Sequence, residues 1–377
     1  MIQLSSYITE AQVLMAQELI NQSNNVVILT HMSPDGDAMG SSLAIRHFLE
    51  AQGKQVNVIV PNAFPDFLAW LPKADLHIIY EKSKADADAI LEQAELIICT
   101  DFNDPKRIGS LGNKMLSLSC KKMMIDHHLH PADFPDLTIS YPACPSTCEL
   151  VYRLICELQR SELQRSDLQH SDLQRSELQR SDLQRSDLTN IATCIYTGMM
   201  TDTGNFSFNS NHAEMYQIIS ELVAAGVDKD AIYNRVFNAY SADRMRLMGY
   251  CLYQKMKIFP EHHTALIYLS RKELYRFNFQ SGDAEGIVNL PLQIKDVYYS
   301  VFMREDKVNP SEVGLAGGSK NKIKISLRSQ GDRPVNVFAK DIFGGGGHAN
   351  ASGGEYYGPL PEAVQRFMDN YQDYFVL

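Results

Sequence analysis

The strongest constraint on the fold is the regular alternation of apolar runs with amphipathic stretches in the first third of the chain. Runs rich in Val, Ile and Leu occur at 25–31, 55–61, 95–101 and 122–128, and their composition and length predict β-strands. The stretches at 42–53 and 84–94 have helical periodicity. Strands that alternate with helices build βαβ units around a parallel sheet. The sequence therefore predicts an α/β fold with a parallel sheet in its first domain.

Three of these predicted strands end in His or Asp, and a fourth polar loop follows a later helix. The loop HMSPDGDAMGSS joins the first strand to a helix, and Asp202 lies in a tight turn after the helical segment from Leu188. Ligands of open α/β sheets bind outside the carboxyl ends of the strands. The polar set expected at this edge is His31, Asp35, Asp37, Asp101, Asp126, His127, His128 and Asp202.

Five carboxylates in one place repel each other unless cations compensate them. Imidazole combined with carboxylate oxygen suits Mn²⁺, Zn²⁺ or Fe²⁺, and the excess of oxygen favours Mn²⁺. The set holds more ligands than one ion needs, so a bridged pair of ions about 3.5–4 Å apart is the expected arrangement. Any single Asp or His of the set could instead be a turn residue or a hydrogen-bonded side chain.

A second, smaller α/β domain with a mixed sheet is predicted from about Ile258 onward. Strands are expected at 264–270, 297–305 and 322–329, and helices at 334–343 and 361–371. We expect a first domain over 1–221, a helical linker over 222–257 and the second domain over 258–377. In the strand KIKISL, period-two alternation sends the Ile and Leu side chains to one face and the Lys and Ser side chains to the other.

The second domain also has the features of an anion-binding region. Residues 318–340 include six basic residues and one acid, within a chain of net charge −10. The glycines at 344–347 allow a backbone to approach an anion closely. A solvated sheet face and a plain turn are the structural alternatives for these two features.

A low-complexity tract with a period of five occupies Leu158 to Leu188. Its S-[DE]-L-Q-R units resemble the pentapeptide repeat of β-helices, but six copies are too few to bury a core. In a helix, a period of five advances about 140° per copy, so the leucines form no stripe. We therefore expect a solvated, partly helical insertion that extends the helix before it and has no chemical role.

Composition excludes several classes of protein. The net charge of −10 argues against a general nucleic-acid coat, which needs a basic surface. Seven cysteines without a Cys-x-x-Cys pair indicate a reducing compartment rather than a disulfide framework. No apolar run reaches the roughly 20 residues that cross a bilayer, and no secretory signal is recognisable. We expect a cytoplasmic protein with no membrane partner.

Four segments in order, HMSPDGDAMGSS, CTDFND, IDHHLH and GMMTDTGNFSF, resemble the four motifs of the DHH phosphoesterase family, subfamily 1. The segments KISLRS and GGGGHANASGG resemble the smaller DHH-associated C-terminal domain of that subfamily. The layout is similar to that of the stand-alone bacterial nano-RNase and pAp phosphatases.

This resemblance implies a role for each site residue. One Mn²⁺ would be held by His31, Asp35 and Asp101, and the second by Asp37, Asp101, His127 and Asp202, with Asp101 as the bridge. Asp101 would thus also be catalytic, together with His128 near the reacting phosphate and Asp126 orienting an imidazole. The implied substrate-binding residues are Arg328, Ser329, Gly345, Gly346, Gly347 and His348.

The resemblance implies a Mn²⁺-dependent phosphohydrolase that degrades short oligoribonucleotides as an exonuclease and dephosphorylates 3′-phosphoadenosine 5′-phosphate (pAp). Hydroxide activated by two metal ions would attack phosphorus. One alternative is a phosphodiesterase for pApA or cyclic di-AMP. Another is a non-catalytic nucleotide sensor, which the retention of all the metal-binding side chains disfavours. A homodimer is left open.

Overall fold

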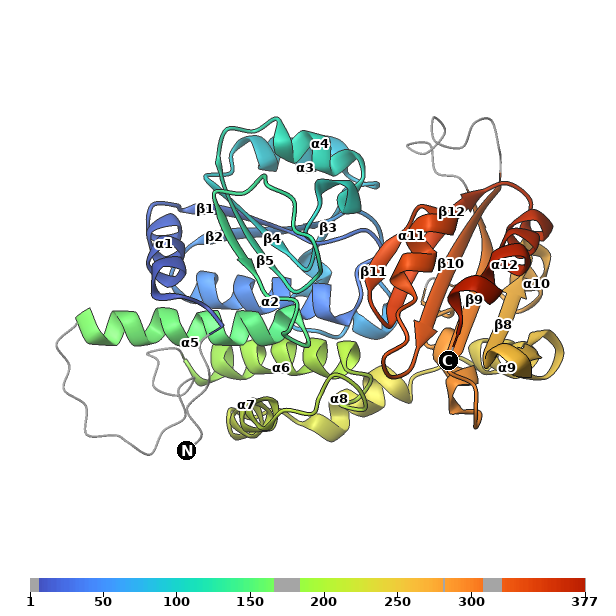
Figure 1. Cartoon of the computed structure of the whole chain (residues 1–377). Coiled ribbons are helices and arrows are strands. Elements are labelled where there is room, and N and C mark those ends of the chain that lie inside the picture. The colour runs from blue at the N-terminus through green and yellow to red at the C-terminus, as the bar shows by residue number, and fades with distance from the viewer. Residues whose placement is uncertain (1–6, 166–183, 281, 308–320, 377) are drawn as a thin grey trace. The chain divides into compact units, whose positions relative to one another are not determined.

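The computed structural model describes residues 7–165, 184–280, 282–307 and 321–376. The chain divides into two compact units, Met1–Ala239 and Tyr240–Leu377 (Figure 1). This division falls inside the segment 222–257, for which the sequence predicts a linker. The domain boundaries at 221 and 257 remain predictions.

The first unit is built on a six-stranded parallel sheet with the order β3-β2-β1-β4-β5-β6. The strands are β1 (Asn25–Leu29), β2 (Gln55–Val60), β3 (Ile78–Ile79), β4 (Leu96–Thr100), β5 (Lys121–Asp126) and β6 (Leu137–Ser140). The predicted parallel α/β fold is confirmed. The sequence analysis missed β3 and β6, which are the two edge strands and the shortest.

Helices cover both faces of this sheet. The helices are α1 (Glu10–Asn21), α2 (Gly36–Ala51), α3 (Lys84–Glu92), α4 (Ser110–Leu116), α5 (Thr147–Arg165), α6 (Arg185–Asp202), α7 (Ala213–Ala224) and α8 (Lys229–Phe237), with 3₁₀ turns at Asp66–Leu68, Ala74–Leu76 and Pro105–Ile108. Figure 1 shows α2, α5 and α6 on one face and α3 and α4 on the other.

The two cores of this unit follow from the pleat of the strands. Successive side chains of a strand point to opposite faces, so Val26 and Ile28 of β1 pack in the core beneath α2, α5 and α6. Val27 and Leu29 pack in the core beneath α3 and α4. A strand buried on both faces has no polar alternation, which explains the continuous apolar runs in the sequence.

The repeat tract joins α5 to α6. Its first residues, 158–165, continue α5, and residues 185–188 begin α6, so the predicted extension of the preceding helix is confirmed there. Residues 166–183 lie outside the described part of the chain. The 19 residues of α5 make a helix about 28 Å long, and α5 and α6 pack against each other. The repeat therefore leaves α5 at the end remote from Thr147, the first residue of that helix.

The second unit has a mixed six-stranded sheet with the order β11-β12-β10-β9-β8-β7, in which only β8 and β9 pair in parallel among the described residues. Its strands are β7 (Lys257–Phe259), β8 (Thr264–Leu269), β9 (Tyr299–Lys307), β10 (Asn321–Ser329), β11 (Gly346–His348) and β12 (Ala351–Tyr357). Its helices are α9 (Ala242–Tyr250), α10 (Arg271–Arg276), α11 (Asn336–Phe343) and α12 (Leu360–Tyr374), with a π-helix at Cys251–Lys255 and 3₁₀ turns at Pro260–His262 and Ile287–Gln293.

The predicted alternation in β10 is confirmed for its apolar face. Ile323, Ile325 and Leu327 are buried beside Phe338 and Phe367 of α11 and α12. On the opposite face, Lys322 does not fit the alternative of a solvated sheet face. Its side chain is 3% exposed and its ammonium lies 2.8 Å from a carboxylate oxygen of Glu355 on the neighbouring strand. The ion pair across the strands accounts for this burial.

No helix in the described ranges is long and apolar enough to cross a membrane.

Candidate metal centre

The site in the first unit lies where β1, β4 and β5 end. These strands are neighbours in the sheet and parallel, so the residues that follow them meet at one edge. His31 follows β1, Asp101 follows β4, and Asp126 is the last residue of β5. Asp101 has a φ of 62°, a left-handed conformation that Asp tolerates better than most residues. This turn aims the side chain of Asp101 across the sheet edge.

One group of candidate ligands combines His31, Asp35 and Asp101. Nε2 of His31 lies 3.3 Å from Oδ2 of Asp101 and 3.7 Å from Oδ1 of Asp35. Nδ1 of His31 lies 3.0 Å from the carbonyl oxygen of Met32, and a proton on Nδ1 leaves Nε2 free to act as a ligand. The three ligand atoms lie within 4.8 Å of one another, which is close enough for one ion.

Asp35 also begins the helix that carries the next ligand. It is the N-cap of α2, and its Oδ1 accepts hydrogen bonds from the backbone N–H groups of Asp37 and Ala38. Such a cap satisfies N–H groups that have no partner inside the helix. The cap fixes Asp37 in the first turn of α2, two residues from Asp35.

A second group combines Asp37, His127 and Asp202, the last residue of α6. Nε2 of His127 lies 3.4 Å from Oδ2 of Asp202 and 3.8 Å from Oδ2 of Asp37. Nδ1 of His127 lies 3.0 Å from the carbonyl oxygen of Cys144. A backbone carbonyl oxygen near Nδ1 therefore orients both His127 and His31.

Asp101 lies between these two groups. Its Oδ2 faces His31 at 3.3 Å, while its Oδ1 lies 3.7 Å from Nε2 of His127. The side chain of Asp101 is 2% exposed. One buried carboxylate thus presents one oxygen to each group of candidate ligands.

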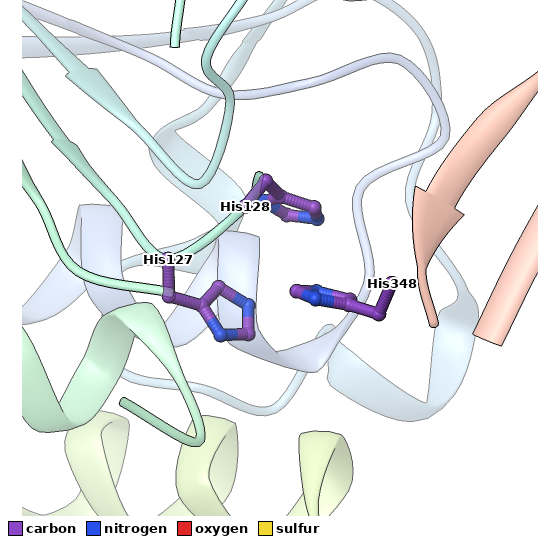
Figure 2. Close-up of side chains that lie close together, drawn as sticks. All are labelled: His127, His128 and His348. Carbon is purple, nitrogen blue, oxygen red and sulfur yellow. The ribbon is translucent and has the colours of Figure 1, made fainter. Parts of the chain in front are cut away.

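Asp126 contacts His128 through both of its carboxylate oxygens. Oδ1 of Asp126 lies 2.8 Å from Nδ1 of His128, and its Oδ2 accepts the backbone N–H of His128 at 2.7 Å. Figure 2 shows that His127 and His128 come from the same loop, and their rings meet edge to face at 4.8 Å. Asp126 therefore orients the imidazole of His128.

The protonation of the site reflects crowded, buried charge. Burial, together with the neighbouring carboxylates of Asp101 and Asp202, raises the pKa of Asp37 well above its usual range. Burial by itself lowers the pKa of His31, but hydrogen bonds with Asp101 and Asp35 outweigh it and raise the pKa to about 10. Burial opposes ionisation of Asp35, yet its hydrogen bond with His31 lowers the pKa of the carboxyl.

The donor set fits divalent cations. Four carboxylates and two imidazoles make up the two groups, and the ion pairs of Asp37 and Asp101 within the described ranges are all with imidazoles rather than Lys or Arg. Buried carboxylates are normally paired or coordinate metals. Mixed oxygen and imidazole ligands are typical of Mn²⁺, Zn²⁺ or Fe²⁺ sites.

The sequence analysis missed Thr147, although it lies within the site. Its hydroxyl donates to Oδ1 of Asp101 at 2.8 Å, and its backbone N–H donates to Oδ2 of Asp37 at 2.6 Å. The segment Ser146–Glu149 has the S-x-x-E pattern of a helix start, so the sequence contains the signal for the helix end. It contains no signal that this end faces the carboxylates.

Three glycines allow the helices of the site to touch. A Cβ at Gly36 of α2 would lie 2.2 Å from Oγ1 of Thr201 on α6. A Cβ at Gly198 of α6 would lie 2.1 Å from Sγ of Cys148 and 2.9 Å from Oδ1 of Asp37, and one at Gly40 would lie 2.5 Å from a carbonyl oxygen of α6. The close contact among α2, α5 and α6 therefore depends on residues without side chains.

The predicted substrate-binding residues lie together in the second unit. Arg328 and Ser329 end β10, and Arg328 pairs in register with Ala351 of β12. The guanidinium of Arg328 donates to the carbonyl oxygen of Leu327 at 2.9 Å. Ser329 donates through its hydroxyl to the carbonyl oxygen of Arg333.

The glycines at 344–347 have structural roles that the sequence analysis did not predict. Gly344 ends α11 with a φ of 62°, which is the usual role of glycine at a helix C-terminus. Gly346, Gly347 and His348 form β11, which pairs with β12 as a hairpin. A Cβ at Gly345 would lie 1.9 Å from the carbonyl oxygen of Gly353. The role of these glycines and of His348 in binding an anion remains a prediction.

Comparison with known proteins decides the family. Residues 25–199 match the model described as DHH family, N-terminal domain, and residues 267–376 match the DHHA1 domain. The chain belongs to the DHH family. The DHH match covers β1 through most of α6, so it includes every candidate ligand except Asp202.

Three relatives span most of this DHH-family chain. A solved structure from Bacteroides fragilis, described as an exopolyphosphatase-related protein, is 45% identical with a TM-score of 0.83, and 98% of each chain is covered. The bifunctional oligoribonuclease and PAP phosphatase NrnA of Thermus thermophilus is 27% identical over 94% of this chain and 92% of that protein. The cyclic-di-AMP phosphodiesterase GdpP of Bacillus subtilis is 22% identical over 95% of this chain but 49% of that protein.

Proposed function

We propose that this DHH-family chain is a metal-dependent phosphohydrolase that degrades very short RNAs and removes a phosphate from pAp. The observation that carries the proposal is the buried Asp101, which presents one oxygen to each of two groups of imidazole and carboxylate ligands. The oligoribonuclease and PAP phosphatase of T. thermophilus supports the substrate class, because that relative aligns over nearly its full length.

The residues would hold two divalent cations. His31, Asp35 and Asp101 would hold one, and Asp37, Asp101, His127 and Asp202 the other. The excess of carboxylate oxygen favours Mn²⁺. When bound, such a pair of cations lowers the pKa of a water molecule and stabilises the charge that develops on a reacting phosphate.

His128 would contact the reacting phosphate or its leaving group. Its Nδ1 lies 2.8 Å from Oδ1 of the fully buried Asp126, so the Nδ1 proton is held there and Nε2 is the nitrogen that would act on the phosphate. A carboxylate in this arrangement fixes the tautomer and makes Nε2 more basic. Nε2 would donate a hydrogen bond to a phosphate oxygen when the ring is protonated, and accept one when it is neutral.

The substrate grip would come from the second unit. Arg328, Ser329, Gly345, Gly346, Gly347 and His348 are the candidates, and a guanidinium is suited to a phosphate that is not the reacting one. The net charge of −10 gives no general attraction for long nucleic acids.

A substrate panel tests the proposal. The purified chain is incubated with Mn²⁺ and pAp, pApA, a 5-mer RNA, a 24-mer RNA, cyclic di-AMP, pyrophosphate or polyphosphate. We expect fastest turnover of pAp and the 5-mer RNA, and none when a chelator replaces Mn²⁺. Polyphosphate belongs in the panel because the B. fragilis relative is described as exopolyphosphatase-related.

Cleavage of pApA or cyclic di-AMP is the second candidate, favoured by the match to the cyclic-di-AMP phosphodiesterase over 95% of this chain. Turnover of those two substrates above pAp and RNA would replace the first proposal with this one. Tight binding of nucleotides without any turnover would instead indicate a sensor.

A further inference from the structure

The N-terminus of α5 contacts two of the candidate ligand carboxylates. The backbone N–H groups of Thr147 and Cys148 donate to Oδ2 and Oδ1 of Asp37 at 2.6 and 2.9 Å. The hydroxyl of Thr147 donates to Oδ1 of Asp101 at 2.8 Å. Thr147 is fully buried, and Asp37 and Asp101 are 1% and 2% exposed, so water does not replace these contacts.

The contacts with Asp37 and Asp101 differ in whether they need a particular residue type at position 147. The hydrogen bonds to Asp37 come from backbone N–H groups at a helix N-terminus, which most residue types would provide. The hold on Asp101 comes from a side-chain hydroxyl, which only Ser or Thr would provide in this space. The identity of residue 147 therefore matters for Asp101 and not for Asp37.

The hydroxyl of Thr147 is not needed to begin its own helix. Ser146 does that, because its hydroxyl accepts the backbone N–H of Glu149 at 3.1 Å. Within the described ranges, the hydrogen bond that the Thr147 hydroxyl makes is the one to Asp101. The hydroxyl of Thr147 therefore constrains the buried carboxylate of Asp101 and not the start of its own helix.

The bond constrains the oxygen that separates the two groups of ligands. Oδ1 of Asp101 faces His127, while Oδ2 faces His31. A donor fixed on Oδ1 stops the carboxylate from rotating about its Cβ–Cγ bond, and so keeps one oxygen directed at each group. Hydrogen bonds to an ionised acceptor are short and strong.

We propose that Thr147 is a positioning residue that orients Asp101 for both cations through its hydroxyl. This inference rests on the proposed function only in that divalent cations bind at this cluster. It assigns Thr147 no contact with substrate. Loss of the hydroxyl should weaken both binding events, because both groups of ligands share Asp101.

The test compares variants at residue 147 by calorimetric titration of chelator-treated protein with Mn²⁺. Thr147→Val keeps the shape and the backbone N–H but removes the hydroxyl, and Thr147→Ala removes it without a second methyl group. Thr147→Ser keeps the hydroxyl. The matched control is Thr264→Val, which removes the hydroxyl of a fully buried threonine that donates to a backbone carbonyl in the second unit.

We expect Thr147→Val and Thr147→Ala to bind both Mn²⁺ ions about 10- to 100-fold more weakly, the usual loss when a partner of a metal ligand is removed. Thr147→Ser should bind within about threefold of the parent, since the donor is retained, and Thr264→Val should bind as the parent does. Rescue by serine separates positioning from packing, because serine lacks the methyl group.

Parent-like Mn²⁺ affinity in Thr147→Val or Thr147→Ala would overturn the inference, as would a serine variant no better than valine. If neither hydroxyl-free variant folds, Thr147 is a core residue and the inference is wrong. A parent protein that binds Mn²⁺ but hydrolyses no member of the substrate panel would end the proposed function and leave this inference standing. A parent that binds no Mn²⁺ would overturn both.

Discussion

Asp126 accepts two hydrogen bonds from His128, one from the backbone N–H at 2.7 Å and one from ring Nδ1 at 2.8 Å. The pair works as a unit in which a buried acid fixes both the position and the tautomer of an imidazole. Removal of the Asp126 carboxylate should therefore lower the rate of the reaction more than the affinity for cations.

Asp126→Asn should lower kcat about 10- to 100-fold with pAp, because an amide cannot stabilise a protonated ring or hold its tautomer as a carboxylate does. Mn²⁺ binding by calorimetry should change less than threefold. A large loss of Mn²⁺ affinity would show that Asp126 is itself a ligand.

Replacement of Asp101 by Ala should abolish turnover and weaken both cations, because its two oxygens face different groups of ligands. We expect more than about a 1,000-fold loss in kcat, the scale of losing an essential charged group at the reacting centre. Elemental analysis after dialysis against limiting Mn²⁺ measures the number of ions retained. Retention of one full equivalent with activity would show that Asp101 does not bridge.

Arg328→Ala should weaken pAp and short RNA by about 1.5–3 kcal/mol in kcat/KM, the range for a hydrogen bond to a charged group. Most of the loss should be in KM, because a phosphate that does not react is held equally in ground and transition states. A small chromogenic phosphodiester, which has no second phosphate, should be hydrolysed as by the parent.

The matched control for Arg328 is Lys340→Ala, which removes one exposed positive charge from the same unit. Equal losses on the nucleotide and the chromogenic substrate would place Arg328 at the reacting phosphate. Equal losses in both variants would reduce its role to a general field effect.

Excision of three whole repeats, 168–182, should leave kcat/KM within about threefold and the thermal midpoint within about 3 °C of the parent. The reason is distance, because α5 ends at Arg165, which is about 28 Å along the helix from Thr147. Steady-state kinetics and differential scanning calorimetry provide the two measurements. A tenfold loss of turnover would give the repeat a part in the reaction.

The stability of the first unit should fall as the pH drops below 6.5 through the titration of His77. Burial lowers the pKa of His77 to about 4, and its Nε2 has no hydrogen-bond partner within the described ranges. The unfolded chain therefore binds this proton first, so the stabilisation is complete above pH 6.5 and is lost progressively toward pH 4.

Between pH 7 and pH 5 this titration should cost about 1–2 kcal/mol of unfolding free energy. His77→Phe, which keeps a ring beside Phe64, should flatten that part of the pH dependence. Urea unfolding at both pH values gives the comparison. An unchanged slope in the variant would assign the acid sensitivity to other groups.

Much of the first unit follows from local pattern. Runs such as 25–29 and 96–100 are apolar on both faces because helices cover both sides of the sheet, and that pattern survives in the sequence. The ends of parallel strands also meet at one edge of the sheet, so His31, Asp101 and Asp126 could be assigned to that edge from the sequence.

The partners within that place could not be derived in the same way. Asp126 is adjacent in sequence to His127 and next but one to His128, and spacing alone does not say which ring it contacts. Thr147 reaches Asp101 across 46 positions, a contact that depends on how α5 packs on the sheet. The burial of Lys322 fits neither an anion-binding face nor the alternative of a solvated face, because period-two alternation says nothing of a partner on the next strand.

The glycine contact at residue 198 has a consequence for how this site chooses an ion. Asp37 from α2 and Asp202 from α6 lie near one imidazole because no side chain separates the two helices there, where a Cβ would lie 2.9 Å from Oδ1 of Asp37. The spacing between the helix backbones sets the distance between these oxygens, and the space left between ligand oxygens discriminates between cations of different radius. A relative that kept every Asp and His but carried alanine at this position would hold the same donor atoms around a wider space, and would select a larger ion or none.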